Sequence, residues 1–193
     1  MLRDLITRNR SYRRFFQDVA VEHSTLVELV ELARRSPSAA NRQPLKYVLV
    51  SDAATCARVF PCLAWAGYLA DWPGPVEGEQ PAAYMVMLGD KDITATFGCD
   101  HGIAAQSILL GAVERGLGGC IIGSIQRELL CATLAIPTRY EVLLVLALGR
   151  PKETVVLEPL GPSGGIKYWR DEHGVHHVPK RPLADLILGC GTE

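Results

Sequence analysis

Apolar residues recur along this chain with two different spacings, which divide it into helices and strands. A spacing of three to four residues is typical of one helix face, and short unbroken apolar runs are typical of buried strands. The pattern predicts helices over residues 2–8, 24–35, 53–72 (as one or two pieces), 101–115, 126–134 and 183–188. It predicts strands over residues 46–51, 82–88, 116–124 and 141–148. Because helices and strands mix without regular βαβ alternation, we expect an α+β fold in a single domain, residues 1–193.

Two of these elements should be deeply buried. The segment 82–88 carries no charged residue, which indicates a strand covered on both faces. The helix 101–115 is apolar on almost every side, so we expect it in the protein core or between two subunits. Asp100 is expected to cap this helix, and Gly116 to end it.

Composition and charge exclude several classes of protein. Of the 193 residues, 48% are hydrophobic and 21% are charged, and the net charge is −1. Such a charge gives no general attraction to nucleic acid or to an anionic membrane surface. The longest apolar run, 142–148, is too short to span a bilayer, and residues 1–8 are not typical of a signal peptide. We therefore expect neither nucleic acid nor a membrane as a partner.

The cysteines indicate free thiols. They form no C-x-x-C pair and stand at Cys56, Cys62, Cys99, Cys120, Cys131 and Cys190. In a chain without a secretion signal this pattern predicts a cytoplasmic location.

Three short motifs fail on their context. Gly116-x-Gly118 lacks the last glycine of a dinucleotide fingerprint and precedes a strand rather than a helix. The G-x-S-x-G letters around Ser163 lack the flanking strand and helix of a nucleophilic serine. Cys99, His101 and the tail histidines do not have zinc-ligand spacing, so we expect no metal site and exposed tail histidines.

Two polar segments remain, and the first is basic. In the extended segment 9–16, residues of one parity point the same way, so Ser11 and Arg13 can face one anion beside Arg10. Arginine with a neighbouring hydroxyl is a common way to hold phosphate. A solvated basic surface loop is the alternative interpretation.

The second polar segment is a turn that carries two carboxamides. Pro37 and Pro44 bracket small residues together with Asn41 and Gln43. Carboxamides both donate and accept, so a pair on a stiff turn suits a ligand edge with alternating donors and acceptors. Taken by itself, the segment is more typical of a capped turn whose carboxamides bond only to local backbone.

Together these segments describe a site for flavin mononucleotide (FMN). Lys180 and Arg181 near the end of the chain can complete an anion site, and Gly123 and Ser124 can present bare backbone N–H groups. No acid–base pair or nucleophile stands out, as in proteins whose cofactor performs the chemistry.

Several segments, taken in order, resemble the nitroreductase family of FMN enzymes over nearly the whole chain. They are NRSYRRF (9–15), SPSAANRQP (36–44), DHGIAAQSILLGA (100–112), GLGGCIIG (116–123), GRP (149–151) and KRPL (180–183). The resemblance implies a three-layer fold with a central, mostly antiparallel sheet flanked by helices. It also implies an intertwined homodimer with two FMN sites at the interface, each built from both subunits.

The residues that the resemblance assigns to the flavin fall into three groups. The phosphate and ribityl chain would be held by Arg10, Ser11, Arg13, Lys180 and Arg181. The isoalloxazine ring would be contacted by Pro37, Ser38, Ala39, Asn41 and Gln43, the first three coming from the partner subunit. The backbone of Ile122, Gly123 and Ser124 would approach the N5 edge.

The activity implied by the resemblance is an FMN-dependent oxidoreductase. It would pass two electrons from NADH or NADPH to an electron-poor acceptor (a nitroaromatic, a quinone or an enone) by a ping-pong mechanism. Two other hypotheses are a specialised flavin enzyme, dehalogenase-like or flavin-fragmenting, and a non-catalytic flavin-binding redox sensor that uses Cys120. Trp65, Tyr68 and Trp72 could line an acceptor pocket or pack in the core.

Overall fold

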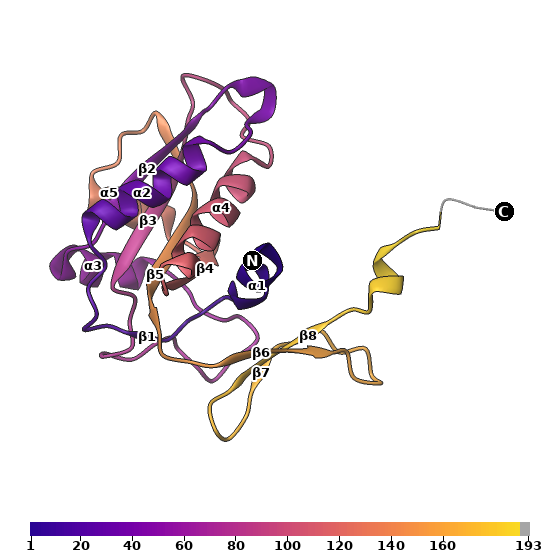
Figure 1. The fold of residues 1–193 in the computed structure, drawn as a ribbon. Coiled ribbons are helices and arrows are strands. Elements are labelled where there is room, and N and C mark those ends of the chain that lie inside the picture. The colour runs from indigo at the N-terminus through magenta and orange to yellow at the C-terminus, as the bar shows by residue number, and fades with distance from the viewer. Residues whose placement is uncertain (190–193) are drawn as a thin grey trace.

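A five-stranded sheet forms the centre of the structure (Figure 1), a computed structural model that describes residues 1–189. Its strands are β1 (Phe15–Phe16), β2 (Leu45–Val50), β3 (Ala83–Asp90), β4 (Gly118–Ile122) and β5 (Tyr140–Pro151). They follow the order β1-β5-β3-β2, and β4 also pairs with β5. Every pairing in this sheet is antiparallel, so the predicted α+β class with a mostly antiparallel sheet is confirmed.

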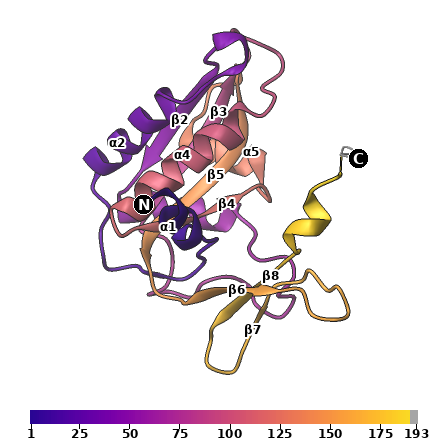
Figure 2. The same ribbon diagram turned by 45° about the vertical axis from the view of Figure 1, so that its right-hand side comes forward.

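Helices cover both faces of this sheet and make three layers (Figures 1 and 2). The core of one face is built with α2 (His23–Arg34) and α4 (Asp100–Glu114). The core of the other face is built with α3 (Ala53–Val59), the 3-10 turn η2 (Phe60–Cys62) and α5 (Arg127–Leu134). The first helix, α1 (Leu2–Arg8), contacts α4.

The central strand β3 divides its side chains between the two cores. Successive residues of a strand point to opposite faces. Met85 and Met87 accordingly pack toward α2 and α4, whereas Tyr84 and Val86 pack toward α3 and α5. All four are fully buried, which confirms the prediction made from the charge-free segment.

A second, three-stranded sheet lies beside the main body, and the chain continues from it as an extended tail (Figure 1). β6 (Val155–Pro159) runs parallel to β8 (His176–Lys180), which pairs antiparallel with β7 (Trp169–Arg170). The helix predicted over 183–188 is only the 3-10 turn η3, Leu183–Leu186. Cys190 lies outside the described residues.

Two further predictions differ from the structure. The helical segment expected over 53–72 ends at η2, because Pro61 interrupts it and residues 63–82 follow an irregular path. Asp100 does not cap α4: the N-cap is Cys99, and the carboxylate of Asp100 points to another segment, described below. In the part of the chain that the structure describes, no helix is long and apolar enough to cross a membrane.

Candidate functional site

Four of the five predicted phosphate ligands line one cavity of about 300 Å³, which we call the cationic cavity. Four parts of the chain build it: the segment after α1, α4, β4 and the region from Tyr168 through β8. The residues that line it are Asn9, Arg10, Ser11, Arg13, Gln106, Leu109, Gly119, Ile121, Tyr168, His176, Val178 and Lys180. The two ends of the predicted anion site, 170 residues apart, are therefore brought together.

Backbone pairing places these residues. Ser11 forms a parallel bridge with Gly119 of β4, and the N–H of Tyr12 donates to the Gly119 carbonyl at 3.0 Å. A Cβ at Gly119 would lie 2.7 Å from the backbone oxygen of Ala147, so only glycine fits there. On the other side, alternate residues of β8 deliver Val178 and Lys180 to the cavity.

The cations of this cavity are not neutralised by the protein. Arg10, Arg13 and Lys180 make no ion pair with any of residues 1–189. The Nε of Arg10 is also buried without a hydrogen-bond partner in that part of the chain, and burial lowers the pKa of this guanidinium. Arg10 and Arg13 are half-buried and Lys180 is exposed, so three unpaired positive charges converge on one cavity, and this arrangement favours an anionic ligand.

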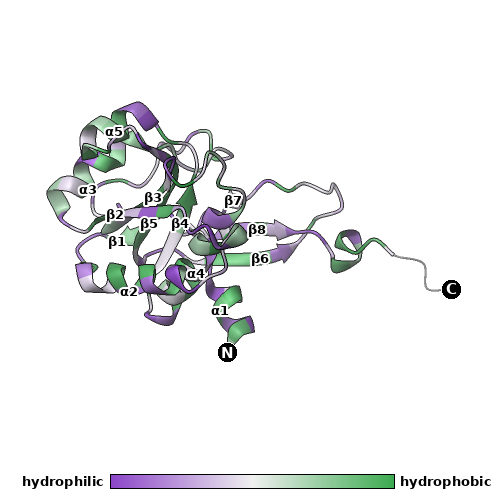
Figure 3. Ribbon diagram, turned by 90° about the horizontal axis from the view of Figure 1, so that it is seen from above, coloured by the Kyte–Doolittle hydropathy of each residue, from purple (hydrophilic) through white to green (hydrophobic). Residues whose placement is uncertain are grey.

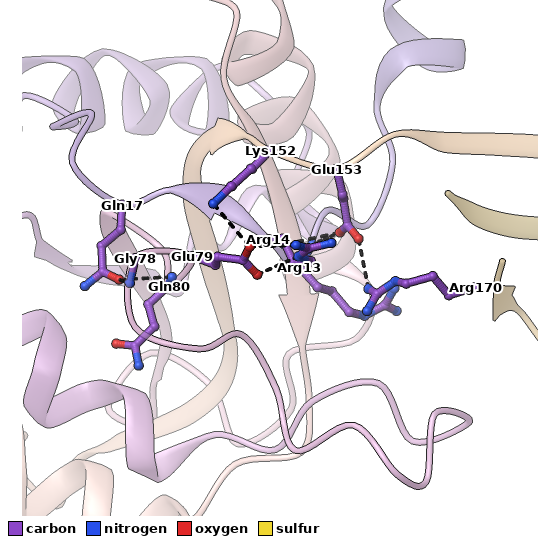
Figure 4. A network of polar contacts seen from close by, with 9 residues as sticks. All are labelled: Arg13, Arg14, Gln17, Gly78, Glu79, Gln80, Lys152, Glu153 and Arg170. Atoms are coloured by element: carbon purple, nitrogen blue, oxygen red, sulfur yellow. Dashed lines mark hydrogen bonds and ion pairs between the residues drawn. The ribbon is translucent and has the colours of Figure 1, made fainter. Parts of the chain in front are cut away.

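Neighbouring cations just outside the cavity are paired, as Figure 4 shows. Arg14 Nε lies 2.5 Å from a carboxylate oxygen of Glu79, and Arg170 Nη2 lies 3.0 Å from Glu153. The contrast between paired and unpaired arginines therefore coincides with the boundary of the cavity.

Glu153 binds the backbone of the basic segment but forms no ion pair with the Arg13 side chain. The Glu153 side chain is fully buried, and its Oε1 accepts the backbone N–H groups of Arg13 and of Arg14, the latter at 3.2 Å (Figure 4). The Glu153 carboxylate binds the backbone of Arg13 and the side chain of Arg170. The Arg13 guanidinium therefore has no ion-pair partner among residues 1–189. No sequence signal singled out Glu153, since its partners come from distant segments.

Glu79 should make the stability of the protein pH-dependent in the acid range. Hydrogen bonds from Arg14, and then from Lys152, lower the pKa of Glu79 to about 2. The resulting stabilisation is fully present above the ordinary carboxyl pKa of about 4.5 and is lost as the pH falls toward 2. We expect the thermal midpoint of Glu79→Gln to fall less than that of wild type between pH 5 and pH 2. The exposed neighbour variant Glu77→Gln should retain the wild-type slope, and identical slopes for Glu79→Gln and wild type would contradict the assignment.

The carboxamide turn lies at a different cavity, which we call the turn cavity. It encloses about 380 Å³ between α2, the turn, β2 and α4, and it includes Pro37, Ser38 and Gln43. It shares no lining residue with the cationic cavity. Within one chain, the predicted flavin residues are thus divided between two places.

Asp100 holds this turn in an unusual conformation. The Ser38 hydroxyl donates to Asp100 Oδ2 at 2.6 Å, and the Ala39 N–H donates to Oδ1 at 3.0 Å. The turn, which includes η1 (Ala39–Asn41), contains three non-glycine residues with left-handed φ near 50°: Ala40, Asn41 and Gln43. Such strain persists only where surrounding contacts enforce it, and it is concentrated at functional sites.

The other predicted ring contacts lie on and after β4. The side chain of Ile122 is buried in the core, whereas Ile121 lines the cationic cavity. Gly123 and Ser124 follow β4 and are exposed, and the Ser124 carbonyl accepts from the Ala64 N–H at 3.0 Å.

Other residues that the sequence singled out lie away from both cavities. Arg181 is exposed and lines neither of them. Trp65 is buried against Phe60, and Trp72 packs at the edge of the same core, so both belong to the packing interpretation. Tyr68 is half exposed and lies beside Tyr168.

The prediction of exposed tail histidines is wrong for two of the three, because His177 is only partly exposed and lies against Glu158 and Asp171. His173 is exposed, but His176 lies inside the cationic cavity and is 1% exposed. Alternation along β8 decides this burial, and a strand over 176–180 was not predicted from the sequence.

Cys120 should be a poorly reactive thiol. It is buried in β4, and burial raises its pKa despite the nearby Arg13 charge, so little thiolate is present near neutral pH. We expect iodoacetamide to modify Cys120 in the folded protein at least about tenfold more slowly than the exposed Cys99, as measured by peptide mass spectrometry. Equal modification rates of Cys120 and Cys99 would support the redox-sensor hypothesis. If Cys120 has no redox role, the variant Cys120→Ser should retain any flavin that the wild-type protein binds.

The sequence of the chain matches the model of a protein family. The sequence model of the nitroreductase family matches residues 6–150, which is more than half of the chain. This chain belongs to the nitroreductase family. The resemblance noted in the sequence is thereby confirmed, and the family supports a flavin-dependent oxidoreductase.

Solved structures of this nitroreductase fold are similar to the chain. An FMN-dependent nitroreductase from Clostridium difficile R20291 is 23% identical, with a TM-score of 0.64, over 77% of this chain and 86% of that one. A nitroreductase-like protein from Streptococcus mutans is 16% identical, with a TM-score of 0.66, over 79% and 91% of the two chains. A nitroreductase family protein from Clostridium novyi NT is 22% identical, with a TM-score of 0.63, over 79% and 87%. At these identities the likeness concerns the fold alone.

Proposed function

We propose that this nitroreductase-family protein is an FMN-dependent NAD(P)H oxidoreductase. One observation carries the proposal: Arg10, Arg13 and Lys180 line one cavity without ion pairs to residues 1–189, while Arg14 and Arg170 beside it are paired. Three free cations and a hydroxyl suit a phosphate carrying two negative charges. The phosphate end of FMN therefore fits the cationic cavity.

In this proposal each group of residues has a separate task. Arg10, Ser11, Arg13 and Lys180 hold the phosphate. Arg181, which is exposed next to Lys180, closes on the phosphate only when FMN is bound. The turn with Pro37, Ser38, Ala39, Asn41 and Gln43 faces the ring, as does the backbone of Ile122, Gly123 and Ser124. When bound, FMN supplies the transfer of two electrons from NADH or NADPH to a nitroaromatic, quinone or enone acceptor, in ping-pong order.

We further propose that the site is completed in a homodimer. The turn cavity and the cationic cavity have no lining residue in common, which agrees with a site whose two groups come from different copies of the chain. The tail beyond β8 lies away from the main body (Figure 3). Its large hydrophobic side chains are all exposed: Leu183, Leu186, Ile187 and Leu188. Exposed apolar segments of this kind mark protein interfaces. Light scattering should give the mass of two chains, and a single-chain mass at all concentrations would contradict the dimer.

A cytoplasmic location is part of the proposal. It is supported by the five cysteines of the described residues, which are all free thiols.

The visible absorption spectrum of the purified protein tests the function. We expect an FMN-like spectrum, or its appearance after added FMN, and bleaching on anaerobic addition of NADH or NADPH. A colourless protein that takes up no FMN would overturn the proposal and return Arg10 and Arg13 to a simple basic surface. If the protein binds FMN but neither NADH nor NADPH reduces it, the cofactor assignment would stand and the proposed NAD(P)H oxidoreductase activity would be excluded.

A further inference from the structure

His176 is the most deeply buried titratable side chain of the cationic cavity. It begins β8, where its backbone N–H donates to the Thr154 carbonyl at 2.9 Å. It shares the cavity face of the strand with Val178 and Lys180. The proposed flavin contacts assign no task to it.

The contact between His176 and Arg13 fixes the state of the imidazole. His176 Nε2 lies 3.1 Å from Arg13 Nη1. A guanidinium has only donors, so Nε2 must be the acceptor and the ring proton must reside on Nδ1. Burial and then the charges of Arg13 and Arg170 lower the pKa of His176 to about 4, and Nδ1 is buried without a hydrogen-bond partner among residues 1–189. His176 is therefore neutral at physiological pH.

Every other group that holds the Arg13 guanidinium is neutral as well. The Tyr168 ring centre lies 4.7 Å from the guanidinium carbon and 5.1 Å from the His176 ring centre. The Ser11 carbonyl accepts from Arg13 Nη1 at 3.3 Å. The side chain is thus fixed in place, yet no carboxylate of residues 1–189 pairs with its charge.

We propose that His176 is a positioning residue: a neutral hydrogen-bond acceptor that orients the Arg13 guanidinium for a phosphate dianion without neutralising it. A carboxylate at this position would hold Arg13 equally well, but it would compete with the phosphate for the charge. The inference rests on the proposed function and adds the reason why Arg13 is rigid and still fully charged.

The neighbouring histidine provides a matched control. His177 points to the opposite face of β8, where Nδ1 lies 3.0 Å from Glu158 and Nε2 lies 3.3 Å from Asp171. Its ring stacks on Trp169 with centroids 4.1 Å apart. His176 and His177 are both histidines of β8, but His177 lines neither cavity.

The test compares FMN affinity among His176→Gln, His176→Glu and His177→Gln. Each full-length apoprotein is titrated with FMN at pH 7.5, and folding is checked by circular dichroism. We expect His176→Gln to bind within about threefold of wild type, because the amide oxygen still accepts from Arg13. We expect His176→Glu to bind about 10- to 100-fold more weakly, because its charge pairs with Arg13 and repels phosphate. His177→Gln should match wild type.

Glutamine and glutamate have nearly the same volume, so a role in packing alone predicts equal affinities. Equal FMN affinity of folded His176→Gln and His176→Glu would therefore overturn the inference. If the wild-type protein takes up no FMN, the proposed function fails, and inorganic phosphate replaces FMN as the titrant in the same comparison.

A second measurement needs no variant and no ligand. In ¹⁵N-histidine NMR spectra of the wild-type protein at pH 7, His176 should show an unprotonated Nε2 and a protonated Nδ1. A protonated Nε2 would overturn the proposal even if His176→Glu failed to fold.

Discussion

Replacing Arg13 by glutamine should weaken FMN binding about 10- to 100-fold, because one charge-assisted contact to the phosphate is lost. Arg13 lines the cationic cavity, and its guanidinium has no ion-pair partner among residues 1–189. Its contacts with His176, Tyr168 and Ser11 fix it before any ligand arrives, so little ordering entropy opposes binding. Titration of apoprotein with FMN, followed by flavin fluorescence, measures the change.

A control for Arg13→Gln should remove a cation that lies outside both cavities. Arg58 on α3 is exposed and lines neither cavity, and its guanidinium donates a hydrogen bond to the hydroxyl of Thr55 on its own helix. Arg58→Gln should therefore leave FMN affinity unchanged, which separates a specific contact from a general effect of net charge. If both variants retain wild-type affinity, Arg13 does not hold the phosphate.

Replacing Asp100 by alanine should lower the free energy of unfolding by about 2–4 kcal/mol, since two hydrogen bonds to a buried carboxylate are lost. The side chain of Asp100 is 3% exposed, and both oxygens accept hydrogen bonds, from Ser38 and from the Ala39 N–H. The same bonds hold the turn in which Ala40 and Gln43 have the left-handed conformation, which such residues adopt only at a cost. For a chain of this size the thermal midpoint should fall by about 6–12 °C.

Asp92→Ala is the matched control for Asp100→Ala. Asp92 is exposed, and its ion pair with Arg139, 3.5 Å long, is of the surface kind that contributes little. The thermal midpoint of Asp92→Ala should stay within about 2 °C of that of wild type. Asp100→Asn retains one acceptor and should be intermediate. Equal thermal midpoints of Asp100→Ala and Asp92→Ala would show that the turn does not need the hydrogen bonds to Asp100.

The two variants separate the two halves of the proposed site. Arg13→Gln should change flavin affinity with little change in stability, because nothing in the described core depends on this guanidinium. Asp100→Ala should lower the free energy of unfolding directly. It should weaken flavin affinity only indirectly, because the turn that carries Asn41 and Gln43 is loosened. An effect of Asp100→Ala on flavin affinity would support the placement of the turn at the ring.

Most helices and strands could be predicted because their signals are local. The charge-free run of β3 and the almost wholly apolar α4 need no knowledge of distant residues to be recognised as buried. Segments without such a period were mistaken or missed: residues 63–72 were expected to be helical but are irregular, and β6 was not foreseen. Short strands such as β6 depend on pairing with a distant partner, here β8, rather than on their own sequence.

The sequence by itself determined the fold class, the family and the types of residue that suit FMN, because these depend on local periodicity and on ordered short motifs. Only the tertiary structure decided which of those residues meet. It brought Arg10, Arg13 and Lys180 into one cavity and left the carboxamide turn at another. It also assigned supporting tasks to Asp100, Glu153 and His176, whose partners are 62, 140 and 163 residues away along the chain. Spacing along the sequence carries no information about such contacts, because they arise from sheet pairing and burial.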